Sequence, residues 1–348
     1  MTDHLRTAIR AMAGYTPGEQ PRDGEFIKLN TNENPYPPSP RVFEALRDAL
    51  TGDRLRKYPD PIGTHFRQVA GRVLNVDPDG ILIGNGSDDV LTIVTRAFVP
   101  EGGLVVSPTP SYLLYRTLAE LQGARFQTVP FAADWGLPEP WPLARANLTF
   151  IANPNSPSGT QVPIAALNRL REQLHAPLVI DEAYVDFAEE DALALVRSGK
   201  NAIVTRTLSK SYSLAGIRFG FLVADPALVR ELVKVKDSYN CDVLSQVAAA
   251  AALEDQDYLR ATRAKVLATR ARLERELSRL GFAVTPSRAN FVWCRHPDRP
   301  AKPIYEELKR QRILVRYMNY EGFGDGLRVS VGSDAEIDRF IEELGRTL

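Results

Sequence analysis

One lysine in this chain, Lys210, lies in a setting that suits covalent chemistry. It stands between hydroxyl residues in segment 206–218, which follows a short, mostly apolar run and reads Arg-Thr-Leu-Ser-Lys-Ser-Tyr-Ser-Leu-Ala-Gly-Ile-Arg. A lysine amine can form a Schiff base with an aldehyde, and Thr207, Ser209 and Arg218 can hold a phosphate dianion. A surface lysine is the ordinary alternative, but the apolar residues on both sides favour an inward one. The segment therefore predicts a site for a ligand that carries an aldehyde and a phosphate.

Pyridoxal phosphate (PLP) is such a ligand, and enzymes hold it through a lysine Schiff base. Asp181 ends the apolar run 176–180, where an acid can be a metal ligand, a helix cap or the partner of a buried cation. Beside PLP it would pair with the ring nitrogen and keep it protonated, so that the ring withdraws electrons. Tyr184 can hydrogen-bond the phenolic oxygen of the same ring. A helix cap with a packed tyrosine is the alternative for this pair.

A second feature that suits an anion is the turn from a strand-like run into a helix at residues 84–89. The sequence Gly-Asn-Gly-Ser-Asp-Asp leaves free backbone N–H groups at the positive end of a helix dipole. Ser87 is equally an ordinary N-cap. Because the Asp88 carboxylate would repel an anion, we assign phosphate contact to the backbone of Gly86, Ser87 and Asp88. Tyr112, after a proline-rich turn, suits either stacking on a planar cofactor or packing in the core.

Two arginines, Arg316 and Arg328, end strand-like runs in the C-terminal part of the chain. Arginines in such places usually form surface ion pairs. A facing pair would instead make a bidentate clamp for a carboxylate or a phosphate. Both are therefore candidate substrate-binding residues.

These candidates are carried by apolar runs that alternate with helix-like runs. Short Val, Ile and Leu runs without polar alternation are typical of strands buried on both faces of a parallel sheet. Alternation with helices predicts an α/β domain, whose ligands bind outside the carboxyl ends of the strands. The polar and Gly-rich segments fall at those ends, which indicates one shared site. The expected strands are 81–83, 104–106, 148–152, 178–180 and 202–205, and the expected helices are 42–50, 87–98, 112–122 and one from 164.

The pattern differs on both sides of this region. Residues 1–40 are rich in Pro, Gly and Asn and predict an arm that packs with a smaller domain. Residues 41–240 are the predicted large domain. Residues 241–348 predict the small α+β domain, with a long helical stretch at 244–280 and strand-like runs such as 290–294 and 313–316.

The composition limits the classes of function. Lys+Arg and Asp+Glu both total 43 among 348 residues, so no electrostatic attraction to nucleic acid or membrane is implied. Cys241 and Cys294 match no metal spacing and are expected to be reduced thiols. The N-terminal residues lack a signal-peptide core, and no apolar run is long enough for a membrane span. We expect a cytoplasmic protein without a metal site.

The order of the motifs is more specific than any one of them. In combination they resemble the fold-type-I PLP-dependent aminotransferases, and among these the histidinol-phosphate aminotransferases, over nearly the full length. The motifs are Leu29-Asn-Thr-Asn-Glu-Asn-Pro35, Tyr58-Pro-Asp60, Gly86-Ser-Asp88, Pro110-Ser-Tyr112, Pro154-Asn-Ser-Pro-Ser-Gly159, Asp181-Glu-Ala-Tyr184, Thr207-Leu-Ser-Lys210, Leu214-Ala-Gly-Ile-Arg218-Phe-Gly220 and Leu327-Arg-Val-Ser-Val-Gly332.

The resemblance implies a role for each candidate residue. Lys210 would be the Schiff-base lysine, Asp181 the partner of the ring nitrogen and Tyr184 the donor to the phenolic oxygen. The remaining roles implied are phosphate contacts by Thr207, Ser209, Arg218 and the backbone of 86–88, ring stacking by Tyr112, and substrate contacts by Tyr15, Asn32, Arg316 and Arg328. Tyr58 would reach into the site of a neighbouring subunit, which makes a homodimer part of the expected mechanism.

One motif departs from the family pattern. The family usually has Asn-Pro-Thr-Gly where this chain has Ser156-Pro-Ser-Gly159, and its asparagine stands one place earlier, at Asn155. Either Ser156 takes the usual role of hydrogen-bonding the cofactor phenolic oxygen, or the loop shifts to present Asn155. We take Asn155 as the candidate.

The implied reaction is amino transfer between small-molecule amino and keto substrates, with Lys210 as general base and acid. L-Histidinol phosphate and 2-oxoglutarate would be interconverted with imidazole-acetol phosphate and L-glutamate, as in histidine biosynthesis. An aromatic amino-acid aminotransferase and a phospho-amino-acid decarboxylase on the same scaffold are alternatives. A non-catalytic PLP-binding module is a further alternative, although binding alone does not need the set Asp181, Tyr184 and Lys210.

Overall fold

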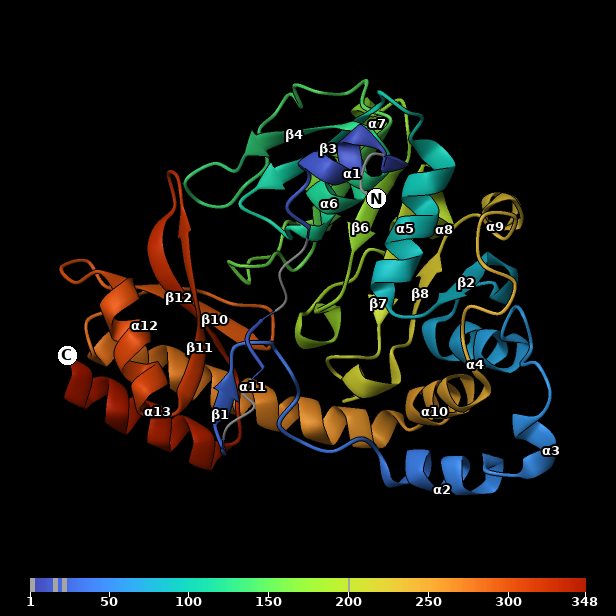
Figure 1. The fold of residues 1–348 in the computed structure, drawn as a ribbon. Coiled ribbons are helices and arrows are strands. Elements are labelled where there is room, and N and C mark those ends of the chain that lie inside the picture. Colours follow the sequence, from blue (N-terminus) through green and yellow to red (C-terminus); the bar gives the residue numbers. More distant parts are fainter. Residues whose placement is uncertain (1–3, 15–17, 21–23, 200) are drawn as a thin grey trace.

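A seven-stranded sheet runs through the larger part of the molecule (Figure 1). The computed structural model describes residues 4–14, 18–20, 24–199 and 201–348. The strand order is β2-β8-β7-β6-β5-β3-β4; β8 is antiparallel to both its neighbours and the other pairs are parallel. The strands are β2 (Ile81–Gly84), β3 (Leu104–Thr109), β4 (Arg125–Pro130), β5 (Leu148–Ala152), β6 (Leu178–Asp181), β7 (Ala202–Thr207) and β8 (Gly220–Val223). The expected mostly parallel sheet is confirmed.

Helices cover both faces of this sheet because its strands carry apolar side chains on both sides. Successive residues of a strand point to opposite faces. Phe150 and Val179 accordingly pack on one face, and Ile151 and Ile180 on the other. The first face is covered by α5 (Ser87–Phe98), α6 (Leu114–Leu121) and α9 (Pro226–Leu232), and the second by α2 (Pro40–Ala49), α4 (Thr64–Leu74), α7 (Ile164–Gln173), α8 (Leu193–Ser198) and α10 (Val243–Glu254).

A second sheet of five strands forms the smaller α+β part, in the order β1-β11-β12-β10-β9. Its strands are β1 (Ile27–Leu29), β9 (Ala283–Thr285), β10 (Phe291–Arg295), β11 (Ile313–Tyr320) and β12 (Gly324–Ser330). The helices α11 (Gln256–Arg279), α12 (Ala301–Arg310) and α13 (Asp334–Thr347) pack against it. Strand β1 pairs in parallel with β11. The small sheet therefore includes a segment that precedes every strand of the large sheet in the sequence.

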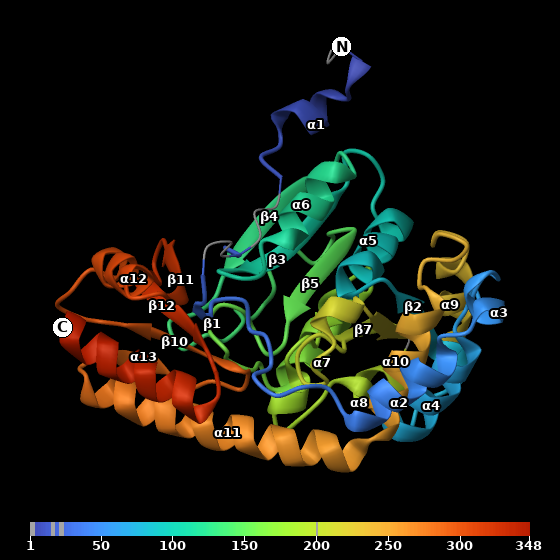
Figure 2. The same ribbon diagram turned by 60° about the horizontal axis from the view of Figure 1, so that its bottom comes forward.

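The stretch expected to be helical from 244 to 280 is two helices that meet at Asp255. The Asp255 carboxylate accepts a hydrogen bond from the backbone N–H of Tyr258 and so caps the start of α11. Helix α10 packs on the large sheet, whereas α11 continues along the molecule to the small sheet (Figures 1 and 2). The division of the chain at residues 40 and 240 stays a prediction.

Three strands, β1, β4 and β8, were not predicted from the sequence. Strand β4 is an edge strand with mostly exposed and polar residues, so it lacks the apolar run of a buried strand. Strand β8 has only four residues and follows Arg218, whose backbone is left-handed with φ of 55°. Two further short helices are α1 (Thr7–Ala11) and α3 (Gly52–Leu55). Helix α1 lies against α6, and just before it Arg6 Nη1 donates to the Leu121 carbonyl at 3.2 Å. Within the described residues, no helix has the length and apolar character needed to cross a bilayer.

Candidate active site

A cavity lies where the carboxyl ends of β5, β6 and β7 meet strands β11 and β12 of the small sheet. It brings together residues that are far apart in sequence, as expected for ligand sites at the carboxyl ends of an open α/β sheet. The candidates that line it are Asn32, Ser87, Asp88, Tyr112, Asp181, Tyr184, Thr207, Ser209, Lys210, Arg218, Arg316 and Arg328.

Asp181 is the last residue of β6, and its buried side chain lines the cavity. Its carboxylate accepts a hydrogen bond from Tyr115 Oη at 2.8 Å and one from Thr205 Oγ1 at 3.2 Å. Burial raises the pKa of Asp181 from 3.8 to about 6, although these two hydrogen bonds act in the opposite direction. A buried carboxylate in this state would be stabilised by a cation beside it, such as a protonated ring nitrogen.

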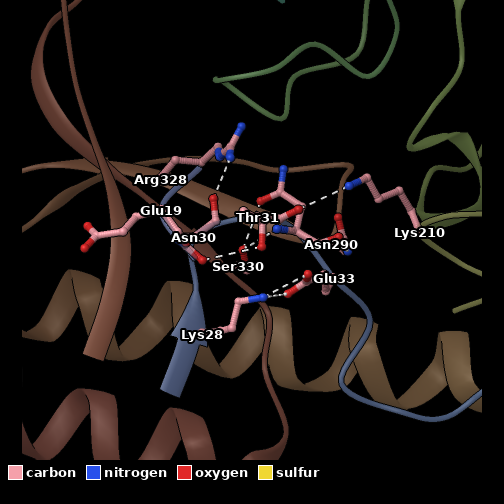
Figure 3. A network of polar contacts seen from close by, with 10 residues as sticks. Glu19, Lys28, Asn30, Thr31, Glu33, Lys210, Asn290, Arg328 and Ser330 are labelled. Atoms are coloured by element: carbon pink, nitrogen blue, oxygen red, sulfur yellow. Dashed lines mark hydrogen bonds and ion pairs between the residues drawn. The ribbon is translucent and has the colours of Figure 1, made fainter. Parts of the chain in front are cut away.

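The amine of Lys210 also lies in the cavity, where Nζ donates a hydrogen bond to the Thr31 carbonyl at 3.1 Å (Figure 3). Burial, together with the positive charge of Arg328, lowers the pKa of Lys210 from 10.5 to about 8. A substantial fraction of the amine is therefore neutral and nucleophilic slightly above neutral pH.

Tyr184 stands next to this lysine, whose Nζ lies 5.9 Å from the centroid of the tyrosine ring. The Tyr184 hydroxyl accepts a hydrogen bond from Asn32 Nδ2 at 3.0 Å. Burial raises the pKa of Tyr184 above 10, while the Arg328 charge and the Asn32 bond lower it. The phenol therefore keeps its proton at physiological pH and can donate it in a hydrogen bond.

Hydroxyls, a guanidinium and a helix N-terminus converge at one end of the cavity. Thr207 Oγ1 lies 3.0 Å from Ser209 Oγ, and Arg218 Nη1 lies 3.5 Å from Ser209 Oγ. Helix α5 begins beside them, and Gly86 at its start gives it no side-chain cap. This combination of donors and positive charge suits a phosphate group.

Gly86 allows the close approach that this end of the cavity requires. It has φ of 86°, and a Cβ at this position would lie 2.7 Å from Arg218 Nη2. The positive φ favours glycine, and the missing Cβ leaves room for the guanidinium beside the start of the helix. The Asp88 carboxylate faces Arg218 Nη2 at 3.4 Å and Tyr112 Oη at 3.3 Å, so its charge is turned toward donors.

The other end of the cavity carries the two arginines. Arg316 and Arg328 are directly opposite one another in the antiparallel pairing of β11 and β12, so they form the facing pair that would suit an anion. The expectation that each arginine ends a strand is wrong, because Arg316 lies within β11, which extends to Tyr320, and Arg328 lies within β12, which extends to Ser330. Arg328 donates to Ser156 Oγ at 2.9 Å. It also donates to the Asn30 carbonyl at 2.9 Å (Figure 3).

Comparison with known proteins agrees with this geometry. The family model for aminotransferase class I and II matches residues 24–344. The chain belongs to this family. It is 54% identical to the histidinol-phosphate aminotransferase of Rhodopirellula baltica over 96% of this chain and 92% of that protein. It is 49% identical to histidinol-phosphate aminotransferase 1 of Trichormus variabilis over 97% of this chain and 96% of that protein.

A solved structure extends the agreement to three dimensions. The histidinol-phosphate aminotransferase of Sinorhizobium meliloti, in complex with pyridoxal-5'-phosphate, matches this aminotransferase with a TM-score of 0.89 and 29% identity. The match covers 99% of this chain and 97% of that one. The family and the fold class expected from the motifs are therefore confirmed.

Among the described candidates, Asn155 and Tyr58 are not brought to the cavity of this aminotransferase. The side chain of Asn155 is buried away from it, accepting from Ser111 Oγ at 2.9 Å and donating to the Pro110 carbonyl at 3.1 Å. Ser156 lines the cavity in its place. Tyr58 is 81% exposed and stacks on Tyr239 with 4.5 Å between ring centroids. Tyr15 lies outside the described residues.

Sequence reasoning missed several residues that this site uses. Tyr115, which bonds Asp181, lies three residues after Tyr112, but its apolar neighbours made it look like an ordinary core residue. Thr205 pairs with Asp181 in the register of β6 and β7, so a correct strand alignment would have found it. The Thr31 carbonyl carries no side-chain signal at all.

Proposed function

We propose that the protein is a PLP-dependent histidinol-phosphate aminotransferase. It transfers an amino group between L-histidinol phosphate and 2-oxoglutarate, with imidazole-acetol phosphate and L-glutamate as the other pair. The observation that carries this proposal is a half-buried lysine and a buried acid in one cavity that has a cationic region at each end. The full-length similarity to proteins of that name supports the choice of substrate.

The residues present fit PLP. Asp181 offers the ring nitrogen a carboxylate that burial makes receptive to a cation, and Lys210 offers the aldehyde a nucleophilic amine. Thr207, Ser209, Arg218 and the start of α5 would hold the phosphate, and Tyr112 would stack on the ring. When bound, PLP supplies an electron-withdrawing ring that stabilises negative charge on the substrate carbon.

Lys210 takes the proton from the substrate carbon and holds it at Nζ. Its pKa of about 8 suits a group that must gain and lose a proton near neutral pH. The Thr31 carbonyl accepts a hydrogen bond from this amine and so limits where the proton can travel. Tyr184 would donate a hydrogen bond to the phenolic oxygen of the cofactor.

Arg316 and Arg328 bind the anionic end of each substrate. Their guanidinium groups would take the phosphate of histidinol phosphate in one half of the reaction and a carboxylate of glutamate in the other. The Ser156 hydroxyl and the Asn30 carbonyl orient Arg328 for this purpose.

A homodimer completes the proposal. Tyr58 is exposed and stacks on Tyr239, which is 47% exposed, and a second copy would cover both. Leu55 and Phe43 are further large apolar side chains, 55% and 50% exposed. Tyr58 would then enter the partner's cavity. Mixing inactive Lys210→Ala with impaired Tyr58→Ala should restore activity, because the hybrid has one site with both residues intact. No recovery after subunit exchange would contradict this arrangement.

The protein is further proposed to act in the cytoplasm, where the buried thiols of Cys241 and Cys294 remain reduced. The same proposal divides the chain into an arm at residues 1–40, a large domain at 41–240 and a small domain at 241–348.

A half-reaction test separates the substrate assignment from the aromatic alternative. Purified PLP-loaded protein is mixed with L-histidinol phosphate or with L-phenylalanine, and the loss of visible cofactor absorbance is followed. We expect kcat/KM for histidinol phosphate to exceed that for phenylalanine at least about tenfold, because its phosphate offers the arginine pair more charge and more acceptor oxygens than the single carboxylate of phenylalanine. Preference for phenylalanine would overturn the substrate, and no reaction with any amino donor would overturn the aminotransferase assignment.

A further inference from the structure

Asn32 lies in the segment that follows β1 and is almost fully buried, and its four polar groups all have partners. Its backbone N–H donates to Ser330 Oγ at 2.9 Å, and its carbonyl accepts from Asn290 Nδ2 at 2.9 Å. Its Oδ1 accepts from Ser330 Oγ at 3.0 Å, and its Nδ2 donates to Tyr184 Oη at 3.0 Å. The residue therefore joins the small sheet to the tyrosine of the cavity. Figure 3 shows Asn290 and Ser330 close to this segment.

The direction of each hydrogen bond follows from the chemistry of the groups. The Ser330 hydroxyl accepts the backbone proton of Asn32, and its own single proton goes to Asn32 Oδ1, which can only accept. The nitrogen end of the Asn32 amide is thereby turned toward Tyr184. Because Nδ2 can only donate, the Tyr184 oxygen accepts. The hydroxyl proton of Tyr184 takes no part in this hydrogen bond and is available to donate in another one.

We propose that Asn32 is a positioning residue, held by Ser330, that fixes Tyr184 as the hydrogen-bond donor to the phenolic oxygen of the cofactor. The proposal rests on the proposed PLP-dependent function. It differs from a direct contact between Asn32 and the substrate, because Asn32 acts here through bonds that Nδ2 and Oδ1 make within the protein, to Tyr184 and Ser330. Without Asn32, the Tyr184 proton can turn to other acceptors.

The backbone of Asn32 allows a clean test. Its φ of 56° is left-handed, a conformation that glycine adopts at no steric cost. Asn32→Gly therefore keeps the conformation and both backbone hydrogen bonds and removes only the amide. No charge is added or removed, so the effects of Arg328, Asp181, Asp88 and Lys210, which face Tyr184 from β12, β6, α5 and the loop after β7, stay the same.

The test measures the pH midpoint of the visible absorbance of the PLP-loaded protein. A donor at the phenolic oxygen stabilises its anionic form and lowers this midpoint. We expect Asn32→Gly to raise the midpoint by roughly one pH unit, a tenfold change in proton affinity. In the Tyr184→Phe background the same substitution should cause no further shift, because the group through which Asn32 acts is gone.

Equal shifts in the two backgrounds, or no shift in Asn32→Gly, would overturn the proposal. A rise in KM at constant kcat that persists in Tyr184→Phe would instead indicate a substrate contact. If Asn32→Gly does not fold, Ser330→Ala serves the same purpose, since it frees the amide to rotate; it should raise the midpoint less, and only when Tyr184 is present. A wild-type protein without visible absorbance would contradict the proposed function itself, which separates the two failures.

Discussion

Tyr115 donates a 2.8 Å hydrogen bond to the carboxylate of Asp181 beneath the cavity. Both side chains are buried, and Tyr115 stacks on Phe150 of β5 with 4.6 Å between ring centroids. The tyrosine is therefore fixed by packing, and the acid is fixed by the tyrosine. A rigid acid can face a cofactor ring without the cost of reorganising during the reaction.

Replacing Tyr115 by phenylalanine should slow catalysis. The substitution removes a hydrogen bond that lowers the pKa of Asp181, so the carboxylate becomes a poorer partner for a protonated ring nitrogen. We expect kcat to fall about tenfold, as for the loss of one hydrogen bond to a charged group, with KM for glutamate nearly unchanged. Steady-state kinetics check this. Tyr258→Phe, which removes a surface bond to the Pro37 carbonyl, is the matched control, and equal effects of the two would contradict the role of Tyr115.

Asp181→Asn should stabilise the PLP-free protein while it removes activity. The folded-state pKa of Asp181, about 6, lies above its ordinary 3.8. Between pH 3.8 and 6, Asp181 therefore holds a proton in the folded state that it has already lost in the unfolded state. The carboxylate thus lowers the free energy of unfolding as pH rises from about 4 to 6, by roughly 3 kcal/mol at most. Urea unfolding at pH 7.5 should show the variant to be more stable, with the difference shrinking near pH 4.

The same variant gives a control with the cofactor. PLP should raise the melting temperature of the wild type more than that of Asp181→Asn, since only the wild type offers the ring nitrogen a charge. Greater stabilisation of the variant by PLP would contradict the assignment of Asp181.

The capture of PLP by the cofactor-free protein should depend on pH through Lys210. Burial lowers the pKa of this amine to about 8, so the reactive neutral fraction rises up to that pH and levels off above it. The rate at which visible absorbance appears after mixing measures this profile. Arg328→Gln removes a positive charge that also lowers the pKa, so its profile should shift to higher pH. A shift to lower pH, or a profile that is flat from pH 7 to 10, would be inconsistent with a buried amine.

Asn155 and Ser156 should affect different properties. Asn155→Ala removes buried hydrogen bonds to Ser111 and Pro110, which should lower the free energy of unfolding by about 1–3 kcal/mol and leave the reactive residues in place. Ser156→Ala loses the hydroxyl that Arg328 contacts, which should raise KM for the anionic substrate a few-fold with little change in stability. Chemical denaturation and kinetics on both variants test this. The reverse pattern would show that Asn155 serves the site.

Particular residues show what sequence alone could predict. Asp181, Tyr184 and Lys210 could be placed because each follows a short apolar strand, and parallel strands bring their ends together. Arg316 and Arg328 could be suggested as a pair, but their opposition depends on the register of β11 and β12. The choice between Asn155 and Ser156 depends on the direction in which one loop presents its side chains.

Contacts made by backbone groups could not be predicted from the sequence for a different reason. The carbonyls of Thr31 and Asn30, which meet Lys210 and Arg328, depend on the path of the chain and not on side-chain type. The link between Ser330 and Tyr184 could not be found from the sequence. It runs through Asn32, which hydrogen-bonds both residues and lies nearly 300 positions before Ser330 in the chain.

The most direct test of the central claim is to find which lysine carries the cofactor. Borohydride reduction makes the bond between a lysine amine and the PLP aldehyde permanent, and peptide mass spectrometry then locates the added mass among the nine lysines of the chain. We predict that Lys210 alone carries the label. We also predict that no label appears when excess L-glutamate, without 2-oxoglutarate, has first converted the cofactor to its amine form. A label on another lysine, or none on protein reduced with bound PLP, would contradict the central claim.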